Sequence, residues 1–349
     1  MFKSISPTKI LLFAVLVFSG INAAAEDLFP IEEKGKWGFI NKSGKVIVTP
    51  QYEFAGSFYD GMASVKSGGK YGFIDGTGKL VVSALYDKTT DFGDGMAGVK
   101  TGAKWSYINK TGTKVFDATC TFAYKFCDGL ARFQIGTGGS TVKLGYYDKT
   151  GKIAIAADYE YAYDLCEGLA RVKKGTKWGF IDKTGKAIID FQFDECFDFS
   201  ESMANVRKGD EKTGKWGFID KTGKMVIDYQ FDRAWFFSDG MALIRVGDFK
   251  NGKFGYIDKT GKIAINPQFT GASFFKDGLA CVSTSALVNG VLKDEKWSYI
   301  DKTGKTVISK QFNYMSNFKG GVAKVKSADL KAGYSFGYID KTGKYVWPL

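Results

Sequence analysis

The chain of 349 residues contains no histidine. This absence excludes Ser-His-Asp and Cys-His catalytic pairs, histidine-bound zinc and the usual proton carrier near neutral pH. A phosphate-binding glycine loop and the spacing of a calcium loop are also missing, although the chain has 44 glycines. We therefore expect no catalytic residues, no cofactor and no metal site. A pair of carboxylates, as used by glycosidases, stays open as an enzymatic alternative.

Long hydrophobic runs are missing too, apart from a short one near the start. Lys3 and Lys9 precede the apolar run Ile10–Phe18. Ala23–Ala25 is a small-residue pattern of the kind after which signal peptidase cleaves. The run is shorter than the roughly 20 apolar residues that span a bilayer. We predict a signal peptide at 1–25, cleaved near Ala25, and a periplasmic or secreted mature chain with no transmembrane segment.

One phrase, Lys-Trp-Gly-Phe-Ile-Asp-Lys-Thr-Gly-Lys, recurs along the rest of the chain, most fully at Lys177–Lys186 and Lys215–Lys224. A fixed period of this length indicates a repeat architecture. Its aromatic position recurs at intervals between 34 and 43 residues, at Trp37, Tyr71, Trp105, Leu144, Trp178, Trp216, Phe254, Trp297 and Phe336. Residues 26–349 are thus predicted to form one domain of nine units.

Within one unit the pattern predicts three strands. Leu169–Lys173 alternates as a half-buried strand does, and Trp178–Ile181 and Lys186–Ile189 are rich in residues that favour sheets. Asp182–Gly185 is a turn, in which Gly185 supplies the positive φ. Such a meander cannot bury a face alone and must pack on its neighbours.

The fold class is therefore all-β. Closed propellers usually have four-stranded blades, about 4 to 8 of them, whereas the sequence indicates three strands and nine units. We favour an open, curved, solenoid-like array of nine three-stranded antiparallel units, with a propeller-like ring as the alternative. Between units, residues spaced by three, such as Tyr52, Ala55 and Phe58, suit one helical turn or a tight loop.

The recurring phrase, followed by an aromatic/Ala/aromatic connector and an Asp/Glu-Gly-Leu/Met-Ala segment, resembles the WG-repeat (KWG-repeat) family of bacterial proteins. The resemblance covers essentially all of 26–349. It implies a scaffold or binding role and carries over no catalytic residues.

Most acidic and aromatic residues occupy repeated positions, so we interpret them as turn and core residues. Among the aromatics, Trp178, Trp216, Phe199 and Phe237 are predicted core residues. Three others lie outside the inward positions and are candidates for the surface: Tyr163, Trp235 and Phe274.

The five cysteines suggest one covalent hypothesis. Cys127 and Cys166 occupy the same position in consecutive units, where stacked neighbours can come close, so a Cys127–Cys166 disulfide is possible. Cys196 occupies a small inward position, and Cys281 an outward one, which makes it the expected accessible free thiol.

The formal net charge of +12 accrues through turn lysines, unit by unit, rather than in one patch. We therefore expect no nucleic-acid partner and weigh a solvated turn against a working basic edge. Insertions at Ile135–Lys143, Lys208–Lys215, Gly247–Lys253, Ser283–Lys296 and Lys326–Ser335 fall on one edge of the array, as binding loops or as tolerated ones. We predict a non-enzymatic binding or scaffold protein for a protein or an anionic cell-envelope polymer; the alternative is a carboxylate-dependent envelope or polysaccharide hydrolase.

The basic edge makes a testable prediction. If the turn lysines form a working basic edge, replacing Lys183, Lys221, Lys259 and Lys302 by Gln should progressively weaken binding to purified lipopolysaccharide, and added salt should weaken it steeply, because exposed charges are screened over about 8–10 Å. If they are only solvated turns, no such binding is expected. Cosedimentation at several salt concentrations measures both effects. Binding that ignores salt would remove the site from these lysines.

Overall fold

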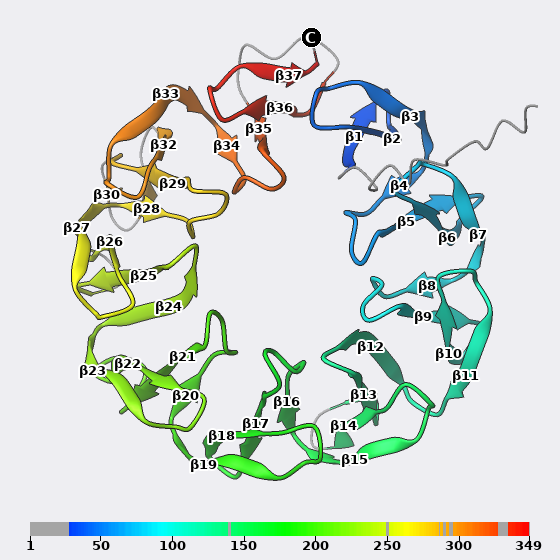
Figure 1. Cartoon of the computed structure of the whole chain (residues 1–349), viewed down its shortest axis with the longest axis horizontal. Helices are drawn as coiled ribbons and strands as arrows, with labels where there is room; N and C mark the ends of the chain where they lie inside the picture. The colour runs from blue at the N-terminus through cyan, green and yellow to red at the C-terminus, as the bar shows by residue number, and fades with distance from the viewer. Residues whose placement is uncertain are drawn as a thin grey trace, which may run out of the picture.

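The computed structural model describes residues 28–138, 141–248, 251–285, 287–288, 291–292, 296–326 and 334–348; the predicted signal peptide lies outside them. Every regular element in these ranges is a β-strand. Nine small antiparallel sheets, here called blades 1 to 9 in chain order, surround a centre (Figure 1). The all-β and nine-unit predictions are confirmed. Of the two arrangements considered, the structure shows the propeller-like ring and not the open array.

Blade 1 has three strands and the other blades have four, which are joined in chain order within each sheet. Blades 1 to 3 contain β1 (Phe29–Glu33), β2 (Lys36–Ile40), β3 (Val46–Tyr52); β4 (Phe54–Ala55), β5 (Met62–Ser67), β6 (Lys70–Asp75), β7 (Leu80–Tyr86); and β8 (Lys88–Thr89), β9 (Met96–Thr101), β10 (Lys104–Asn109), β11 (Lys114–Ala118). Blades 4 to 6 contain β12 (Phe122–Cys127), β13 (Leu130–Ile135), β14 (Lys143–Tyr147), β15 (Ile153–Tyr159); β16 (Tyr161–Ala162), β17 (Ala170–Lys174), β18 (Lys177–Ile181), β19 (Ala187–Phe193); and β20 (Glu195–Cys196), β21 (Met203–Lys208), β22 (Lys215–Asp220), β23 (Met225–Phe231). Blades 7 to 9 contain β24 (Arg233–Ser238), β25 (Met241–Val246), β26 (Lys253–Ile257), β27 (Ile263–Phe269); β28 (Gly271–Ala272), β29 (Ala280–Ser283), β32 (Trp297–Ile300), β33 (Thr306–Phe312); and β34 (Tyr314–Met315), β35 (Val322–Lys326), β36 (Gly337–Asp340), β37 (Tyr345–Trp347). A separate hairpin, β30 (Leu287–Val288) with β31 (Val291–Leu292), lies in the insertion of blade 8.

The fourth strand is the one that the sequence did not reveal. It is the connector: in most blades only two of its residues pair with the next strand, as Phe54 with Lys66 and Ala55 with Val65. Two paired residues are too few for the alternation that marks a strand. We call this first strand the inner strand, because it lies nearest the centre of the ring, with the last strand of each blade outside (Figure 1). Of the two forms considered for the connector, a helical turn or a tight loop, the helical turn does not occur in the connectors that the structure describes.

Local chemistry explains the recurring phrase. Asp182 Oδ1 accepts hydrogen bonds from the Thr184 amide at 2.8 Å and from the Lys186 amide at 3.1 Å, and Gly185 has φ +84°. A bond from the Thr184 hydroxyl lowers the pKa of Asp182. A Cβ on Gly179, the glycine after Trp178, would lie 2.7 Å from the Ile189 carbonyl oxygen, so no larger residue fits there without movement.

Neighbouring blades are joined at their inner turns by carboxylates. Asp60 in blade 2 accepts a bond of 2.6 Å from the Gly95 amide in blade 3, and Asp94 repeats this contact with Gly129. The acidic residues themselves have positive φ, near 50°, which Asp tolerates better than most residues. The contact recurs for the pairs Asp128–Gly168, Glu167–Ser202, Glu201–Gly240, Asp239–Gly278 and Asp277–Gly321.

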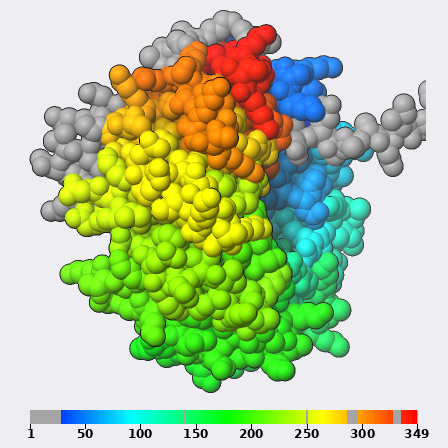
Figure 2. Space-filling model, turned by 60° about the vertical axis from the view of Figure 1, so that its left-hand side comes forward, coloured from blue at the N-terminus to red at the C-terminus, as the bar shows by residue number. Residues whose placement is uncertain are grey.

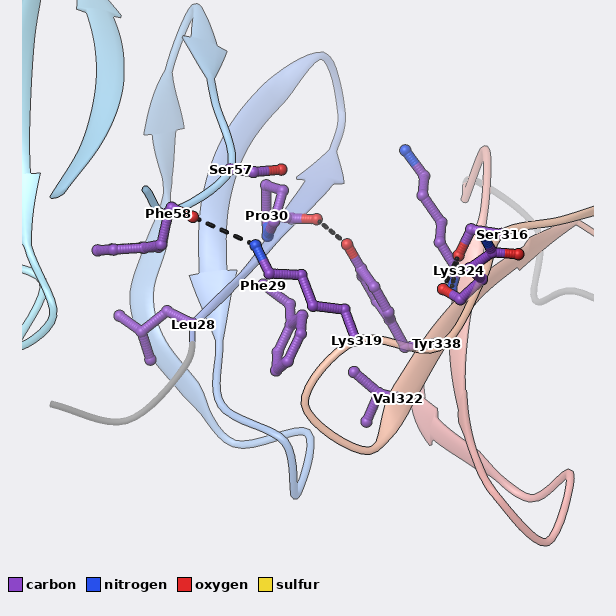
Figure 3. A pocket seen from close by; sticks show the side chains of 11 residues that line it. Leu28, Phe29, Pro30, Ser57, Phe58, Ser316, Lys319, Val322, Lys324 and Tyr338 are labelled. Atoms are coloured by element: carbon purple, nitrogen blue, oxygen red, sulfur yellow. Dashed lines mark hydrogen bonds between the residues drawn. The ribbon is translucent and has the colours of Figure 1, made fainter. Parts of the chain in front are cut away.

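The ring closes where blade 9 meets blade 1, at a contact we call the seam. Blades 9 and 1 are separate sheets, so no strand among the described residues is shared between them. Instead, side chains pack: Tyr338 lies 5.7 Å from Phe29, ring centre to ring centre, and its hydroxyl donates to the Pro30 carbonyl oxygen at 2.9 Å (Figure 3). Away from the seam, the space-filling view shows the later blades as a continuous wall (Figure 2). No helix that could cross a membrane occurs in the part of the chain that the structure describes.

Two glycines with the same backbone conformation test how tight the seam is. Gly44 and Gly185 both have φ +84°, but a Cβ on Gly44 would lie 1.8 Å from the Val346 carbonyl oxygen across the seam, whereas one on Gly185 would meet only the Ile155 side chain at 3.4 Å. The φ strain, about 1–3 kcal/mol, is common to both. Gly44→Ala should therefore lower the free energy of unfolding more than Gly185→Ala. Urea denaturation compares them; equal losses would show that the seam is loose.

Candidate functional site

At one position of the inner segments the residue type varies from blade to blade. We call it the rim position: the residue just before the aromatic or leucine side chain that each inner segment places between blades. The residues around it repeat, and none of the rim residues is fully buried. From blade 2 to blade 9 the rim residues are Ser57, Asp91, Lys125, Asp164, Asp198, Phe236, Phe274 and Asn317. The chemistry along this inner rim thus changes from blade to blade while the backbone does not.

Across blades 4 to 6, arginine and aromatic side chains alternate in a stack. The Arg132 guanidinium lies 3.8 Å from the Tyr124 ring centre and 5.5 Å from that of Tyr163. Tyr163 also contacts the second arginine: the Arg171 guanidinium lies 3.5 Å from the Tyr163 ring centre and 5.1 Å from that of Phe197. Cations over ring faces gain most where water is excluded, and Arg171 is only 7% exposed.

Each arginine of the stack also holds a rim carboxylate. Arg132 Nε lies 3.2 Å from Asp164 Oδ1, and Arg171 Nε lies 2.8 Å from Asp198 Oδ1. Burial raises the pKa of Asp198 even though Arg171 opposes the shift. Burial likewise raises the pKa of Asp91, against Lys125 and Lys319. The rim therefore presents partly desolvated carboxyl groups that the arginines of the stack hold in place.

The next sector of the rim is aromatic. Phe236 and Phe274 lie 4.1 Å apart, ring centre to ring centre, and both stay partly exposed. Of the three surface candidates taken from the sequence, Phe274 belongs to this pair. Trp235 and Tyr163 are half-buried, Trp235 against Phe254 and Tyr163 between the two arginines. The rim position itself was missed, although comparing the units position by position reveals its variability.

Residues from blades far apart in sequence approach one another near the centre. Lys125 of blade 4 and Lys319 of blade 9 both lie over the ring of Tyr59 in blade 2, at 5.5 and 5.1 Å. Beside them is a hollow of about 340 Å³ that Asp91, Tyr124 and Asp164 help to line.

The structure places the four predicted edge lysines in two situations. Lys221 pairs with Glu167 at 3.0 Å and Lys259 with Glu201 at 3.1 Å, each joining neighbouring blades. Lys183 and Lys302 are exposed. Two of the four ammonium groups are thus neutralised by the carboxylates of the inner turns.

The edge that carries the insertions holds a larger hollow. It measures about 610 Å³, lies between blades 6 and 7, and is lined by charged residues of both signs, including Glu211, Lys212, Arg233 and Arg245. Within the described ranges, no group of three or more acidic or cysteine side chains is arranged to hold a metal ion.

Cys127 and Cys166 interact through their side chains but do not form a disulfide here. Their thiols lie within hydrogen-bonding range, and that contact lowers the pKa of the Cys127 thiol and raises that of Cys166. All five cysteines are in the thiol form here. Cys196 is fully buried, as expected. The expectation for Cys281 was wrong: it is 2% exposed, and burial raises its pKa to about 11, because its outward-pointing position faces the next blade and not solvent.

A family model described as WG containing repeat matches the chain at residues 37–71, 71–105, 105–136, 145–178, 178–211, 216–248, 254–284 and 297–329. The search of curated proteins found no match.

Among solved structures, apo AztD from Citrobacter koseri is similar at 11% identity and a TM-score of 0.44, over 91% of this chain and 98% of that one. Hsv2p from Kluyveromyces lactis is similar at 9% identity and a TM-score of 0.39, over 66% and 85%. Oligopeptidase B from Trypanosoma brucei is similar at 8% identity and a TM-score of 0.44, over 88% and 54%. Likenesses this distant say nothing about the function of this chain.

The cysteine geometry gives a covalent prediction. Oxidation of the purified mature protein should yield a Cys127–Cys166 disulfide, because the two thiols lie within hydrogen-bonding range of each other. The bridge requires a Cα separation of about 4.4–6.8 Å. Non-reducing peptide mapping detects the linked peptides. Cys281 should resist alkylation until the protein is denatured; free thiols at 127 and 166 after oxidation would contradict the prediction.

Proposed function

Because the chain belongs to the family of WG-repeat proteins, we propose that it is an exported, non-enzymatic binding protein that uses its inner rim to hold another protein. The observation that carries this proposal is the contrast between repeated and variable positions. Turn, core and blade-joining residues recur in blade after blade, and the ring uses them for its own stability. The rim positions are partly exposed and differ in charge and size, which stability of the ring does not require.

The chemistry of the rim suits a protein more than an anionic polymer. Partly exposed aromatic residues such as the pair Phe236 and Phe274 are enriched in protein interfaces. The adjoining carboxylates Asp164 and Asp198 would repel phosphate or uronate groups and favour basic side chains. Two of the turn lysines, Lys221 and Lys259, already form ion pairs within the ring. A protein ligand with an apolar segment flanked by basic residues fits this arrangement.

One observation favours the enzymatic alternative. Asp164 and Asp198 are close enough to influence each other, and the pKa of Asp198 is raised chiefly by burial, as in a general acid. Against a catalytic role, each is held from behind by an arginine of the stack. An Asp164→Asn/Asp198→Asn variant separates the two: a hydrolase would lose turnover of peptidoglycan or polysaccharide, whereas we expect neither the wild type nor the variant to release product.

The proposal predicts where a protein ligand can be trapped. With p-benzoyl-phenylalanine at Phe236 or Phe274, irradiation of the mature protein in a periplasmic extract should yield one dominant cross-linked protein, identified by mass spectrometry. The matched control carries the same group at Leu85, which is 65% exposed on an outer strand. Asp164→Asn/Asp198→Asn should reduce the rim cross-link severalfold. Equal cross-linking from position 85 would overturn the proposal.

A further inference from the structure

Blade 1 is the incomplete blade. β1 pairs with β2 on one side, and the described residues contain no inner strand on its other side, whereas blades 2 to 9 each have one. At that place lies a hollow of about 250 Å³, lined by β1 residues Phe29 and Pro30 and by Asn317, Lys324 and Tyr338 of blade 9 (Figure 3). The eight inner strands present elsewhere show what such a space accepts.

The first feature is an aromatic contact that the seam lacks. In the other blades except blade 5, which has Leu165, the inner segment places Phe at a fixed point against the Phe or Tyr of the preceding blade. Phe199 lies 4.9 Å from Phe180 in this way, and Phe318 lies 4.8 Å from Tyr299. Tyr338 is the equivalent residue of blade 9, and no inner segment follows it within the described residues. It instead tilts onto Phe29.

The Tyr338 hydroxyl also bonds to β1 in place of an inner strand. Four equivalent tyrosines donate to a carbonyl in or just after the inner strand of the following blade: Tyr107 to Tyr124, Tyr146 to Tyr163, Tyr256 to Ser273 and Tyr299 to Ser316. Tyr338 donates to Pro30 on β1 instead. In blade 2 the equivalent of the Pro30 carbonyl, that of Ser64, accepts from the Gly56 amide beside the inner strand. Tyr338 therefore occupies an acceptor that an inner strand would use.

Lys324 occupies a position whose side chain, in other blades, hydrogen-bonds to the inner strand of the next blade. Arg171 donates to the Cys196 carbonyl at 2.6 Å, and Asn205 donates to that of Ala234 at 2.9 Å, both from this position. The Lys324 ammonium lies half-buried over the Phe336 ring at 3.4 Å, and burial lowers its pKa. Nearby, Asn317 Oδ1 is buried without a hydrogen-bond partner. Both groups are placed to meet a polar backbone that the seam does not supply.

Pro30 does not block this edge. The amide at its position in blades 3, 8 and 9 bonds to a hydroxyl, from Gly98 to Thr90, from Cys281 to Ser273 and from Lys324 to Ser316, and not to the backbone of the inner strand. A residue without N–H therefore costs no ladder bond there.

We propose that the seam binds an extended peptide segment of another protein, which adds to β1 as the missing inner strand. Strand addition of this kind takes its affinity from backbone bonds and its specificity from side-chain pockets. The chain's own inner segments give the sequence class: a small residue followed three positions later by an aromatic one, as in Ala55 and Phe58. An acidic residue two positions before the small one fits as well, since Glu53 accepts from the Gly69 amide in blade 2. The inference rests on the proposed binding role of the ring but uses residues other than Phe236 and Phe274.

The predicted cleavage near Ala25 bears on which chain could supply the missing strand. In blade 2 the inner strand begins at Phe54, eight residues before Met62, the equivalent of Leu28. If the signal peptide is removed at the predicted position, only Glu26 and Asp27 of this chain precede Leu28. An incoming strand from another chain is the occupant that remains.

The test uses the mature protein and a capped, fluorescein-labelled peptide copied from residues 53–59, Glu-Phe-Ala-Gly-Ser-Phe-Tyr, with fluorescence polarisation as the readout. We expect saturable binding. Binding should weaken at least tenfold when the peptide's Ala is replaced by Leu or its second Phe by Ala, because the small and aromatic side chains enter fixed pockets. No saturation at about 1 mM peptide, or equal binding of the three peptides, would overturn the proposal.

Two protein variants should move affinity in opposite directions. Lys324→Met keeps the aliphatic packing but loses the donor, so binding should weaken about tenfold. Lys104→Met, at the exposed start of β10 in blade 3, is the matched control and should change nothing. Tyr338→Phe frees the Pro30 carbonyl, so binding should tighten severalfold. Weaker binding by Tyr338→Phe, or no effect of Lys324→Met, would overturn the assignment. Failure of cross-linking at Phe236 and Phe274 would refute the rim site and leave this one intact.

Discussion

The ring depends on one contact between neighbouring blades. An aromatic side chain in the third strand of a blade packs against the aromatic that the next blade's inner segment places beside it, as in Phe218 with Phe237 at 4.9 Å. Phe237 and Phe218 are both fully buried, although neither could be buried by its own blade alone. Because this apolar contact repeats between blades, its burial supplies most of the free energy that stabilises the ring. The hydrogen bonds from the inner-turn carboxylates can then serve mainly to fix the angle at which neighbouring blades meet.

The sequence predicted the parts of the fold that are local. Asp182 and Gly185 specify their turn through short-range hydrogen bonds and φ, and Trp178 and Phe199 are core because large apolar residues recur at one position. The closure of the ring could not be predicted in this way, since the small rotation between blades accumulates over the whole array and no single residue specifies it. The inner strands were missed because pairing over two residues leaves no periodic trace. Cys281 was misjudged because a strand face that points away from its own sheet can still be covered by a neighbouring blade.

The candidate sites share a logic that only the structure reveals. The rim is variable at a point where the repeat fixes everything around it, and Arg132 and Arg171 show how a variable residue becomes ordered through its aromatic neighbours. The seam is the opposite case, because there a repeated residue, Tyr338, has lost its repeated partner. Neither feature is visible in one unit; both appear when the units are superimposed and their differences are compared.

The seam also has a consequence for how the protein is made. Tyr338 and Pro30 are 308 positions apart in the chain, so the first blade to leave the ribosome finds its last neighbour only after every other blade has emerged. Contacts of such long sequence separation form slowly, because the loop they close is long. Until then Phe29 and Ile31, which end up almost fully buried, face solvent. The first blade to be synthesised is therefore the last to be protected, and a transient exposure of this kind is where chaperones act and where aggregation begins.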